Sequence, residues 1–348
     1  MLKNNGKRLR YALIGTAGRA EWVLKHAGEE HGFELAGLVD VSEKNLAAAR
    51  KQTGLAEDAC FTTATEAIRK LDLDCLIICT PTKFHVPLAI EGIDAGLAVL
   101  TEKGMAPDWD SARRLVDHVE KKQGIVCVAQ NYRYQAQEQT LSACLRGERE
   151  DFDPGALTCV DLIQHRVRPF PRTLNYPFAS VWDMSCHHFD SLMHWIGRPV
   201  ALTGHAFGPE WSPYDHPANT SAHIEFEGGV RVNYFHGHDS ARPLYHLSFH
   251  GRNGALVQSE TNSAKQEGSG VEYSKRPEQQ LGSEEVRQVP LVETPPAEVG
   301  VLRDFYRYVT EGVEPGISAR KNLEVMALCE MFVRSVEEGR RVERKELD

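Results

Sequence analysis

The sequence predicts two domains: an α/β domain with a doubly wound parallel sheet at 1–130, and an α+β domain with a large, mostly antiparallel, open-faced sheet at 131–348. Three observations lead to this prediction. Short apolar runs alternate with helix-like stretches between residues 10 and 130, which is the pattern of βαβ units. A glycine-containing turn directly follows the first apolar run. After Tyr132 the alternation gives way to closely spaced strand-like runs with one clear helix, at 181–196, among them.

The first domain is expected to be built from five strands and five helices. The apolar runs that predict strands are Tyr11–Ile14, Glu34–Val39, Cys75–Thr80, Ala98–Thr101 and Ile125–Ala129. The stretches that predict helices are 19–31, 43–52, 64–70, 84–95 and 108–122. Ser42 stands directly before the second of these helices and is a suitable N-cap. Helices that connect parallel strands cover both faces of the sheet.

The second domain is expected to begin with a helix near 134–147 and then to alternate strands with turns. The predicted strands are 157–164, 200–207, 220–226, 230–236 and 244–250. Glu227-Gly228-Gly229 separates two of them and predicts a hairpin. Residues 260–298 are rich in Ser, Gly, Glu, Gln and Pro without apolar periodicity, which predicts a long surface excursion. Helices at 299–311 and 319–338 close the chain.

Composition and charge exclude several classes of function for this chain of 348 residues. A formal net charge of −9 disfavours nucleic acid as a partner, because phosphates require a basic surface. The apolar run after Arg10 is too short for a signal sequence or a membrane span, so we expect a cytoplasmic protein with no membrane partner. The eight cysteines form no CxxC pair and are interpreted as core residues of a reducing compartment. His236, His238, His246 and His250 lack acidic or cysteine neighbours in a ligand frame, so no metal is predicted.

The turn after the first strand has the features of a dinucleotide-binding loop. The strand leads into Gly15-Thr16-Ala17-Gly18-Arg19-Ala20 and then into a helix. Such a turn presents backbone N–H groups and the positive end of the helix dipole to a pyrophosphate, as in Rossmann domains. Ala17 replaces the second glycine of the usual G-x-G-x-x-G pattern, so we expect a slightly displaced pyrophosphate. The alternative is a purely structural turn between strand and helix.

Asp40 ends the second predicted strand, 22 residues after Gly18. A carboxylate at this position can accept hydrogen bonds from the adenine ribose and repels a 2′-phosphate. We therefore expect NAD as the cofactor in preference to NADP. The alternative is that Asp40 only stabilises a turn.

Four further motifs follow in order along the chain. They are Thr80-Pro81-Thr82-Lys83-Phe84-His85, Glu102-Lys103, Asn131-Tyr132-Arg133-Tyr134 and Asp183-x-x-x-His187-x-x-Asp190. With them, the chain resembles the glucose–fructose oxidoreductase / inositol dehydrogenase / MocA family over nearly its whole length. The resemblance implies NAD(P) at the carboxyl ends of the first-domain strands and a sugar or polyol substrate against the second-domain sheet. It also implies a homodimer or homotetramer formed through the outer face of that sheet.

The resemblance further assigns roles to residues. Lys103, Asp183 and His187 would gather at the nicotinamide and at the substrate, and Glu102, Thr80 and Pro81 would line the nicotinamide and its ribose. His85 and Asn131 are assigned to the cofactor and Arg133 to the substrate. Gly104 stands where the family usually has a proline after the lysine, in a bond that is often cis, so the loop of Lys103 is expected to differ. Ser185 replaces a common glycine, which is a milder change.

The helix at 181–196 is expected to carry the chemistry. On an ideal helix, Asp183, His187, Asp190 and His194 fall within about 60° of one another, opposite an apolar stripe, and are expected to face a cleft. A histidine suits proton removal near neutral pH, so His187 is predicted as general base. Asp183 would orient it or the substrate hydroxyl, and Lys103 would donate to the reacting oxygen. The alternative is a Ser180-x-x-Asp183 capping box with solvated histidines. His188 is interpreted as a packing residue.

The basic segment His165-Arg166-Val167-Arg168 follows a strand and precedes this helix. Arginine binds carboxylate and phosphate in bidentate geometry, so Arg166 is a candidate to hold an acidic sugar. A solvated basic loop or a subunit contact explains the same residues.

These observations predict an NAD-dependent oxidoreductase that acts on a secondary alcohol of a sugar, polyol or sugar acid. A first alternative keeps fold and cofactor but uses transient oxidation to cleave a glycosidic bond. A second alternative is a non-catalytic regulator that senses the dinucleotide. The joint presence of Lys103, Asp183 and His187 argues against the regulator, which needs no proton acceptor.

Overall fold

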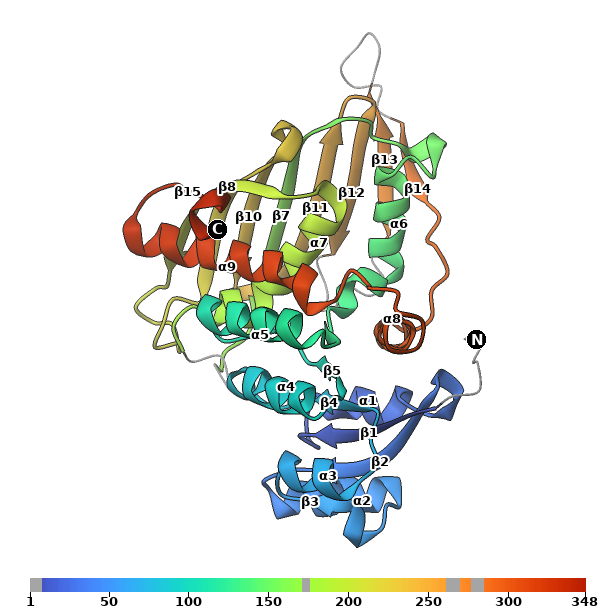
Figure 1. Ribbon diagram of the computed structural model, residues 1–348. Helices are drawn as coiled ribbons and strands as arrows, with labels where there is room; N and C mark the ends of the chain where they lie inside the picture. Colours follow the sequence, from blue (N-terminus) through green and yellow to red (C-terminus); the bar gives the residue numbers. More distant parts are fainter. Residues whose placement is uncertain (1–7, 171–175, 261–269, 277–284) are drawn as a thin grey trace. The chain divides into compact units, whose positions relative to one another are not determined.

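The computed structural model describes residues 8–170, 176–260, 270–276 and 285–348 (Figure 1). The chain forms two compact units, Met1–Asn131 with Pro295–Met326, and Tyr132–Thr294 with Ala327–Asp348. The sequence placed a domain boundary after residue 130 and assigned everything beyond it to the second domain. Residues 295–326 instead belong to the first unit, where Phe305 and Tyr306 pack against Phe33 with ring centroids 6.3 and 6.0 Å away. The apolar period of a helix does not reveal which sheet the helix covers.

The first unit contains a six-stranded parallel sheet in the order β3-β2-β1-β4-β5-β6. Its strands are β1 (Leu9–Ile14), β2 (Phe33–Val39), β3 (Cys60–Phe61), β4 (Cys75–Ile78), β5 (Ala98–Thr101) and β6 (Val126–Val128). All but β3 were predicted. The two residues of β3 are too few to produce an apolar run that sequence reading could detect. Strand order reverses between β1 and β4, and ligands of doubly wound sheets bind at the carboxyl ends of the strands at this point.

Helices connect these strands and bury their apolar sides on the sheet. They are α1 (Ala20–His26), α2 (Glu43–Thr53), α3 (Ala64–Lys70), α4 (His85–Asp94) and α5 (Trp109–Lys122), joined by α8 (Ala297–Glu311) from later in the chain. Ser42 caps α2 as predicted, since its side chain accepts a hydrogen bond from the backbone N–H of Asn45. The helix predicted at 19–31 is wrong in its second half, because α1 ends at His26 and a short 3-10 turn follows Gly28.

The second unit contains a nine-stranded mixed sheet in the order β14-β13-β12-β11-β7-β10-β9-β8-β15. Its strands are β7 (Leu157–Val167), β8 (Pro199–Phe207), β9 (Asn219–Phe226), β10 (Arg231–Gly237), β11 (Asp239–Gly251), β12 (Gly254–Glu260), β13 (Val271–Lys275), β14 (Val286–Val289) and β15 (Val342–Glu343). Its neighbouring strands are antiparallel except for β7 and β10, which run parallel. The predicted fold class, an α/β domain followed by an α+β domain, is confirmed.

The surface excursion predicted at 260–298 is wrong at residues 271–275 and 286–289. β13 and β14 extend the sheet there, and Val271, Tyr273 and Val289 are buried. In strands of four and five residues the buried positions number only one or two each, so the alternation was too brief to recognise. Residues 261–269 and 277–284 lie outside the described residues.

One face of the second sheet is covered by α6 (Ala136–Leu145) and α7 (Cys186–Ile196), as Figure 1 shows. Gln164, His236 and Tyr245 occupy adjacent positions on three neighbouring strands and are buried on this face. Arg231 and Asn233, which alternate with buried residues along β10, are exposed on the other face. The end of α9 (Ala319–Glu338) also belongs to this unit.

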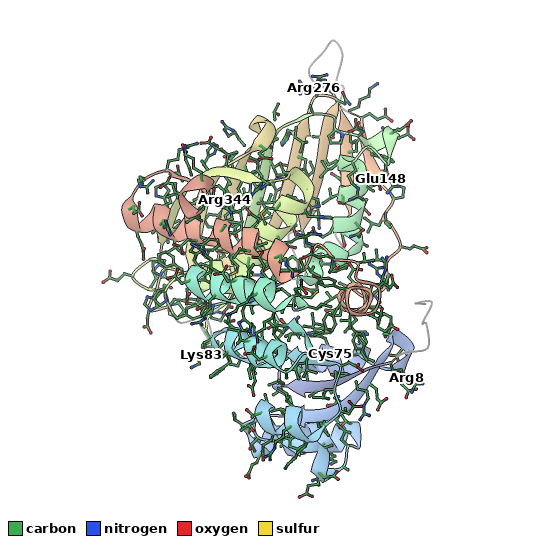
Figure 2. The ribbon with its side chains drawn as sticks, in the orientation of Figure 1. Arg8, Cys75, Lys83, Glu148, Arg276 and Arg344 are labelled. Atoms are coloured by element: carbon green, nitrogen blue, oxygen red, sulfur yellow. The ribbon has the colours of Figure 1, made fainter. Side chains whose placement is uncertain are left out.

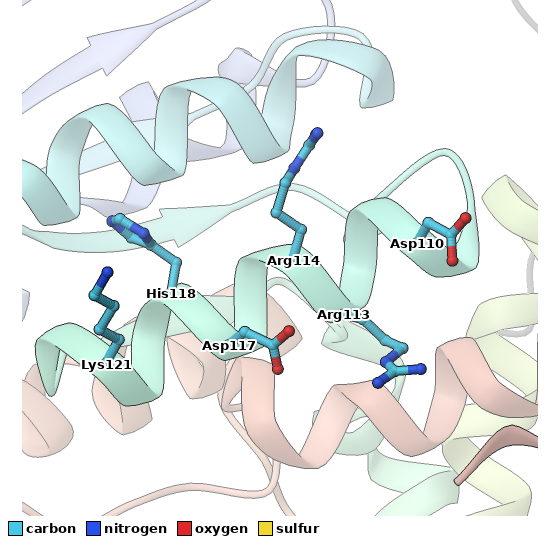
Figure 3. A pocket seen from close by; sticks show the side chains of 6 residues that line it. All are labelled: Asp110, Arg113, Arg114, Asp117, His118 and Lys121. Carbon is cyan, nitrogen blue, oxygen red and sulfur yellow. The ribbon is translucent and has the colours of Figure 1, made fainter.

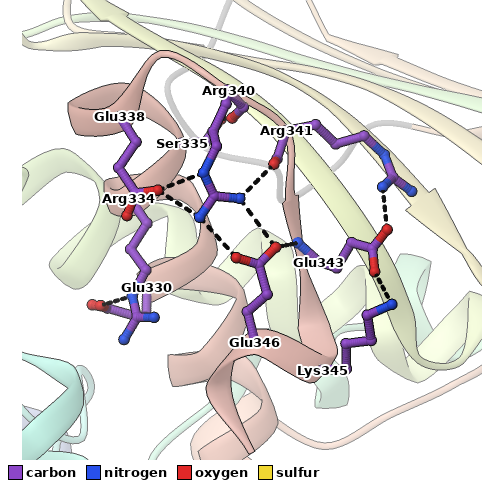
Figure 4. A network of polar contacts seen from close by, with 9 residues as sticks. All are labelled: Glu330, Arg334, Ser335, Glu338, Arg340, Arg341, Glu343, Lys345 and Glu346. Carbon is purple, nitrogen blue, oxygen red and sulfur yellow. Dashed lines mark hydrogen bonds and ion pairs between the residues drawn. The ribbon is translucent and has the colours of Figure 1, made fainter.

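Charged side chains near the carboxyl end of the chain form a network of hydrogen bonds and ion pairs (Figure 4). Arg341 donates to Glu225 of β9 at 2.8 Å, and Arg340 pairs with Glu346 at 2.7 Å. The arginines are exposed to solvent, so each pair adds little to the stability of the fold.

Figure 2 shows the side chains on the ribbon, including that of Cys75 in β4. All eight cysteines lie in described parts of the chain, and none of them forms a disulfide there.

Across the described ranges, no helix is both long enough and apolar enough to cross a bilayer.

Candidate active site

The loop after β1 has the backbone geometry of a phosphate-binding turn. Gly15 has a φ of +82°, and a Cβ there would lie 2.8 Å from the carbonyl oxygen of Cys79 in the adjacent strand end. Gly18 also has a positive φ, +61°, but no atom lies within 4 Å of the position that a Cβ would take there. Within the described residues, the N–H groups of Ala17, Gly18 and Arg19 donate no backbone hydrogen bond. The loop therefore offers donors beside open space, which suits a pyrophosphate.

The two glycines make a matched pair for mutation. Gly15→Ala places a Cβ on a residue with positive φ, where it also clashes with the backbone of Cys79. We therefore expect this change to lower the free energy of unfolding by roughly 2–4 kcal/mol. Gly18→Ala meets no neighbour and should cost only about 1–2 kcal/mol, for the backbone conformation. Urea denaturation of both variants measures the difference, and equal losses would contradict the close packing of Gly15 against Cys79.

Asp40 is buried at the end of β2 and holds the loop in place. One carboxylate oxygen accepts hydrogen bonds from the backbone N–H and the hydroxyl of Thr16, at 2.8 and 3.0 Å. The other accepts from the backbone N–H of Ser42 at 2.8 Å. Asp40 thus has the turn-stabilising role considered as the alternative, and its oxygens retain lone pairs for a further donor.

Glu102, at the carboxyl end of β5, is a buried carboxylate that binds the start of α1. Its Oε1 accepts from Trp22 Nε1 at 2.6 Å and from Arg19 Nε at 3.1 Å. Charged acceptors of this kind form strong hydrogen bonds. The sequence assigned Arg19 and Glu102 separately to the cofactor, and the structure places them against each other. Trp22 was missed, because a tryptophan in an amphipathic helix looks like an ordinary core residue.

His85 fixes the loop that carries Lys103. Its ring nitrogens lie 2.7 Å from the carbonyl oxygen of Gly104 and 2.8 Å from that of Thr80. The side chain therefore ties the end of β4 to the turn after β5. The Lys103–Gly104 peptide bond is cis, so the bond before Gly104 has the conformation that is frequent in the family at the Lys-Pro position. Asn131, also predicted to bind the cofactor, donates to Glu298 of α8 at 3.3 Å.

Asp183 and His187 lie at the start of the helical segment that covers the sheet of the second unit. Val181–Ser185 forms a π-helical turn and α7 follows it, so the ideal 100° spacing does not apply to Asp183. Asp183 accepts a hydrogen bond from the hydroxyl of Tyr176 at 2.7 Å. The ring of His187 stacks on that of Tyr132 at 4.2 Å, with an interplanar angle of 7°. Ser180 makes no capping bond, so the alternative of a capping box is not realised.

The expectation that the whole polar stripe faces a cleft is wrong. Asp190 is 1% exposed and accepts from Arg133 Nε and Nη2 at 2.6 and 2.7 Å. Arg133 Nη1 lies 3.1 Å from His194, whose other ring nitrogen lies 3.1 Å from the hydroxyl of Ser142. The guanidinium that the sequence assigned to the substrate is therefore used to neutralise a buried carboxylate. Opposite charges 57 residues apart could not be paired from the sequence.

Three more histidines of this unit are buried in their neutral form. His188 Nδ1 lies 2.9 Å from the hydroxyl of Tyr234, which agrees with its predicted packing role. Burial, with nearby arginine charge, lowers the pKa of His188 and of His238 to about 3. The pKa of His236 is also lowered by burial. Within the described ranges, no group of three or more histidine, cysteine or acidic residues is arranged to hold a metal ion.

These lowered pKa values make stability depend on pH. Above pH 6.5 the histidines are neutral in both folded and unfolded chains, so they contribute nothing. Below pH 6.5 these histidines bind protons in the unfolded chain but stay neutral in the folded chain. The free energy of unfolding therefore falls as the pH is lowered, until about pH 3. We expect each of His188 and His238 to cost about 1 kcal/mol at about pH 5.8. Urea denaturation at pH 7.5 and 5.8 measures the loss, with the exposed His223→Ala variant as control; equal stability at both values would contradict the neutral cluster.

A recess of about 350 Å³ on the surface of α5 is lined by charged side chains of that helix alone (Figure 3). Its lining residues are Asp110, Arg113, Arg114, Asp117, His118 and Lys121. Acidic and basic side chains are both present there, and none of the predicted site residues is among them. It is a solvated helix surface.

The residues predicted to form the site fall into two sets. Gly15–Ala20, Asp40, Thr80, Pro81, His85, Glu102, Lys103 and Asn131 belong to the first unit, and Arg133, Arg166, Asp183 and His187 to the second. Tyr132 and Tyr176 support His187 and Asp183 but were given no role. Tyr132 belongs to the motif Asn131-Tyr132-Arg133-Tyr134, so its place in that motif could have suggested a role at the site. No feature of the sequence indicated a role for Tyr176.

The six-stranded parallel sheet and its glycine loop define the class of dinucleotide-binding α/β proteins. The chain belongs to the glucose–fructose oxidoreductase / inositol dehydrogenase / MocA family of oxidoreductases. Residues 9–130 match the NAD-binding Rossmann fold of this family, and residues 177–343 match its C-terminal alpha/beta domain. The resemblance inferred from the motifs is confirmed, and so is the prediction of an enzyme.

Two known proteins are similar to this chain in sequence. The chain is 24% identical to the uncharacterized protein y4oX of Sinorhizobium fredii over 90% of its own length and 88% of that protein. It is 28% identical to the inositol 2-dehydrogenase of an Arthrobacter species, over 55% of each chain.

Two solved structures have the same fold. An oxidoreductase of Desulfitobacterium hafniense named for NADPH has a TM-score of 0.82 at 17% identity, covering 98% of this chain and 99% of that one. An oxidoreductase of Agrobacterium radiobacter in complex with NAD⁺, L-tartaric acid and magnesium has a TM-score of 0.81 at 17% identity, covering 98% and 100%.

Proposed function

We propose that this protein is an NAD-dependent dehydrogenase that oxidises a secondary alcohol of a sugar, polyol or sugar acid. The observation that carries the proposal is the buried pair of Asp183 and His187, each supported by a tyrosine, in a chain with an NAD-binding Rossmann fold. A buried aspartate and histidine one turn apart suit proton transfer. The inositol 2-dehydrogenase among the relatives acts, by its name, on a polyol.

The described residues suit a bound dinucleotide. Open space lies beside Gly18, and Thr80 Oγ1 is buried with no hydrogen-bond partner in the described parts of the chain. Gly15–Ala20 would hold the pyrophosphate, and Thr80, Pro81 and His85 would lie along the nicotinamide side. When bound, the nicotinamide accepts the hydride that leaves the alcohol carbon.

The chain's own residues handle the proton and the orientation of the substrate. His187 takes the hydroxyl proton, and the flat stack with Tyr132 restricts the rotation of its ring. Asp183, held by Tyr176, orients the hydroxyl or the histidine. Lys103 donates to the reacting oxygen, from the turn that His85 fastens through Gly104.

We propose NAD in preference to NADP because of Asp40. A solved structure with the same fold is named for NADPH, so the preference is tested by mutation. Asp40→Ser retains a hydrogen-bonding side chain but removes the charge that repels a 2′-phosphate. We expect the ratio of kcat/KM for NAD over NADP to fall at least about tenfold, which corresponds to about 1.4 kcal/mol. An unchanged ratio would mean that Asp40 acts only on Thr16 and Ser42.

The function is tested by following NADH absorbance with a panel of sugars, polyols and sugar acids, with NAD and with NADP. Net reduction of NAD by a free alcohol supports the dehydrogenase. Release of an aglycone from a glycoside without net NADH would support the glycosidase instead. Tight NADH binding with neither reaction across the panel would support the regulator.

We also propose that the protein is cytoplasmic and forms a homodimer or homotetramer through the outer face of the second sheet. That face carries exposed apolar side chains at strand ends, including Val167 and Phe207. Light scattering gives the mass, and a mass of one chain would contradict the oligomer.

A further inference from the structure

A cluster of polar atoms without partners lies on the covered face of the second sheet, beside the helix of Asp183 and His187. Arg166 lies two residues after Gln164 in β7, so both side chains point to the same face of the sheet. Gln164 pairs with His236 of β10, which points to that face as well. His238 follows directly after β10, and its ring lies 4.7 Å from that of His236.

The atoms of this cluster are buried and unsatisfied. Within the described residues, Arg166 Nε, His236 Nε2 and both ring nitrogens of His238 have no hydrogen-bond partner. The same is true of the hydroxyl of Ser180, in the segment just before the π-helical turn. Burying polar groups without partners is costly, and native proteins rarely leave several together. The cluster therefore has the character of a site that a ligand completes.

Its charge indicates the kind of ligand. Arg166 forms no ion pair with any described residue, whereas Arg133 of the same unit is neutralised by Asp190. After burial itself, the positive charges of Arg166 and Arg168 are among the causes that lower the pKa of His188, His236 and His238. A guanidinium thus lies close to neutral histidines, and no carboxylate of the described residues forms an ion pair with it.

The cluster is also connected to the proposed reacting groups. Tyr176, Ser180, Tyr214 and His238 line a narrow recess. Tyr176 donates its hydroxyl hydrogen to Asp183, and the ring of His188, next to His187 in the chain, lies 5.3 Å from that of His236. A ligand group held by the cluster would therefore belong to the same small molecule that meets Asp183 and His187.

We propose that Arg166, His236, His238 and Ser180 bind an anionic group of the substrate, so that the enzyme acts on an acidic sugar and not on a neutral polyol. This inference rests on the proposed dehydrogenase function. Carboxylate and phosphate share the required chemistry, since both accept paired hydrogen bonds from arginine. His236 and His238, as neutral rings, each supply one N–H donor.

The test compares matched acidic and neutral probes. We would measure binding by titration calorimetry and NAD reduction by absorbance with D-gluconate, D-glucuronate and D-glucose 6-phosphate, and with their neutral counterparts D-glucitol and D-glucose. The wild type is compared with Arg166→Gln, which removes the charge, and Arg166→Lys, which keeps it without the planar fork. Arg231→Gln is the matched control, because Arg231 is exposed on the opposite face and pairs with Glu225.

We expect the wild type to bind acids more tightly than their neutral counterparts, and Arg166→Gln to weaken acid binding roughly 10- to 100-fold. Arg166→Lys should fall between the two, while Arg231→Gln and the neutral probes should be unaffected. Better binding of the gluconate or glucuronate arm than of the phosphate arm identifies a carboxylate, and the reverse order identifies a phosphate.

Three outcomes separate this inference from the proposed function. If neutral polyols are oxidised and Arg166→Gln changes nothing, the inference is overturned and the dehydrogenase stands. If Arg166→Gln loses acid binding but no probe reduces NAD, the anion site stands and the dehydrogenase is in doubt. If the wild type binds none of the acids, or the variant binds them equally well, the inference is overturned whatever the activity.

Discussion

Replacing His187 by alanine is expected to lower kcat by roughly 10²- to 10⁴-fold, the usual contribution of a general base. His187 is 5% exposed and stacked on Tyr132, so its ring is held in one orientation rather than turning freely in solvent. Without it, the hydroxyl proton must leave to water as the hydride departs. NADH absorbance under saturating substrate measures the loss.

The matched control is His223→Ala, because His223 is exposed on the uncovered side of the sheet and contacts Asn233. NADH binding, measured by fluorescence titration, should be unchanged in both variants. His187→Gln keeps the volume of the side chain without its basicity and should lose as much activity as His187→Ala. A His187→Ala variant that is folded, binds NADH and turns over at the wild-type rate would exclude His187 as the base.

Replacing Arg133 by methionine is expected to lower the free energy of unfolding by roughly 3–5 kcal/mol. The change leaves the Asp190 carboxylate, 1% exposed, without its bidentate partner. Burial already raises the pKa of Asp190, and the guanidinium of Arg133 opposes that rise, so removing Arg133 favours the neutral acid. Urea denaturation at pH 7.5 measures the change in stability.

The double variant Arg133→Met with Asp190→Leu shows whether the loss of stability comes from leaving the Asp190 carboxylate unpaired. Well-packed apolar residues often replace a buried ion pair at little cost, so the double variant should recover most of the lost stability. At a temperature where Arg133→Met remains folded, its KM should stay near the wild-type value. A large rise in KM without loss of stability would restore the substrate-binding role that the sequence assigned to Arg133.

The fold was largely predictable because its signals are local. The strands and helices of the first unit follow apolar runs and the glycine turn at Gly15, and each is decided by a few consecutive residues. Strands β13 and β14 were missed because they are short, and the packing of α8 in the first unit was not predicted because its partner Phe33 is far away in the sequence. What escaped prediction depends on pairing between distant segments.

The same distinction applies to the candidate site. Family motifs gave Lys103, Asp183 and His187, but the partners that fix their surroundings are distant residues or aromatic side chains. Tyr132 and Tyr176 are examples. The helix period treated Asp190 and His194 like His187, whereas contacts with Arg133 and Ser142 separate them. Helical spacing places side chains on a face and does not say what covers that face.

The most direct test of the central claim is to follow the hydrogen on the oxidised carbon. The enzyme is incubated with NAD and with gluconate or glucitol deuterated at carbon, and the reduced cofactor and product are analysed by mass spectrometry. Direct hydride transfer predicts one deuterium in the reduced nicotinamide for each ketone formed, and the same ratio at a much lower rate for His187→Ala. Product that forms while the cofactor stays oxidised and gains no deuterium would contradict a dehydrogenase.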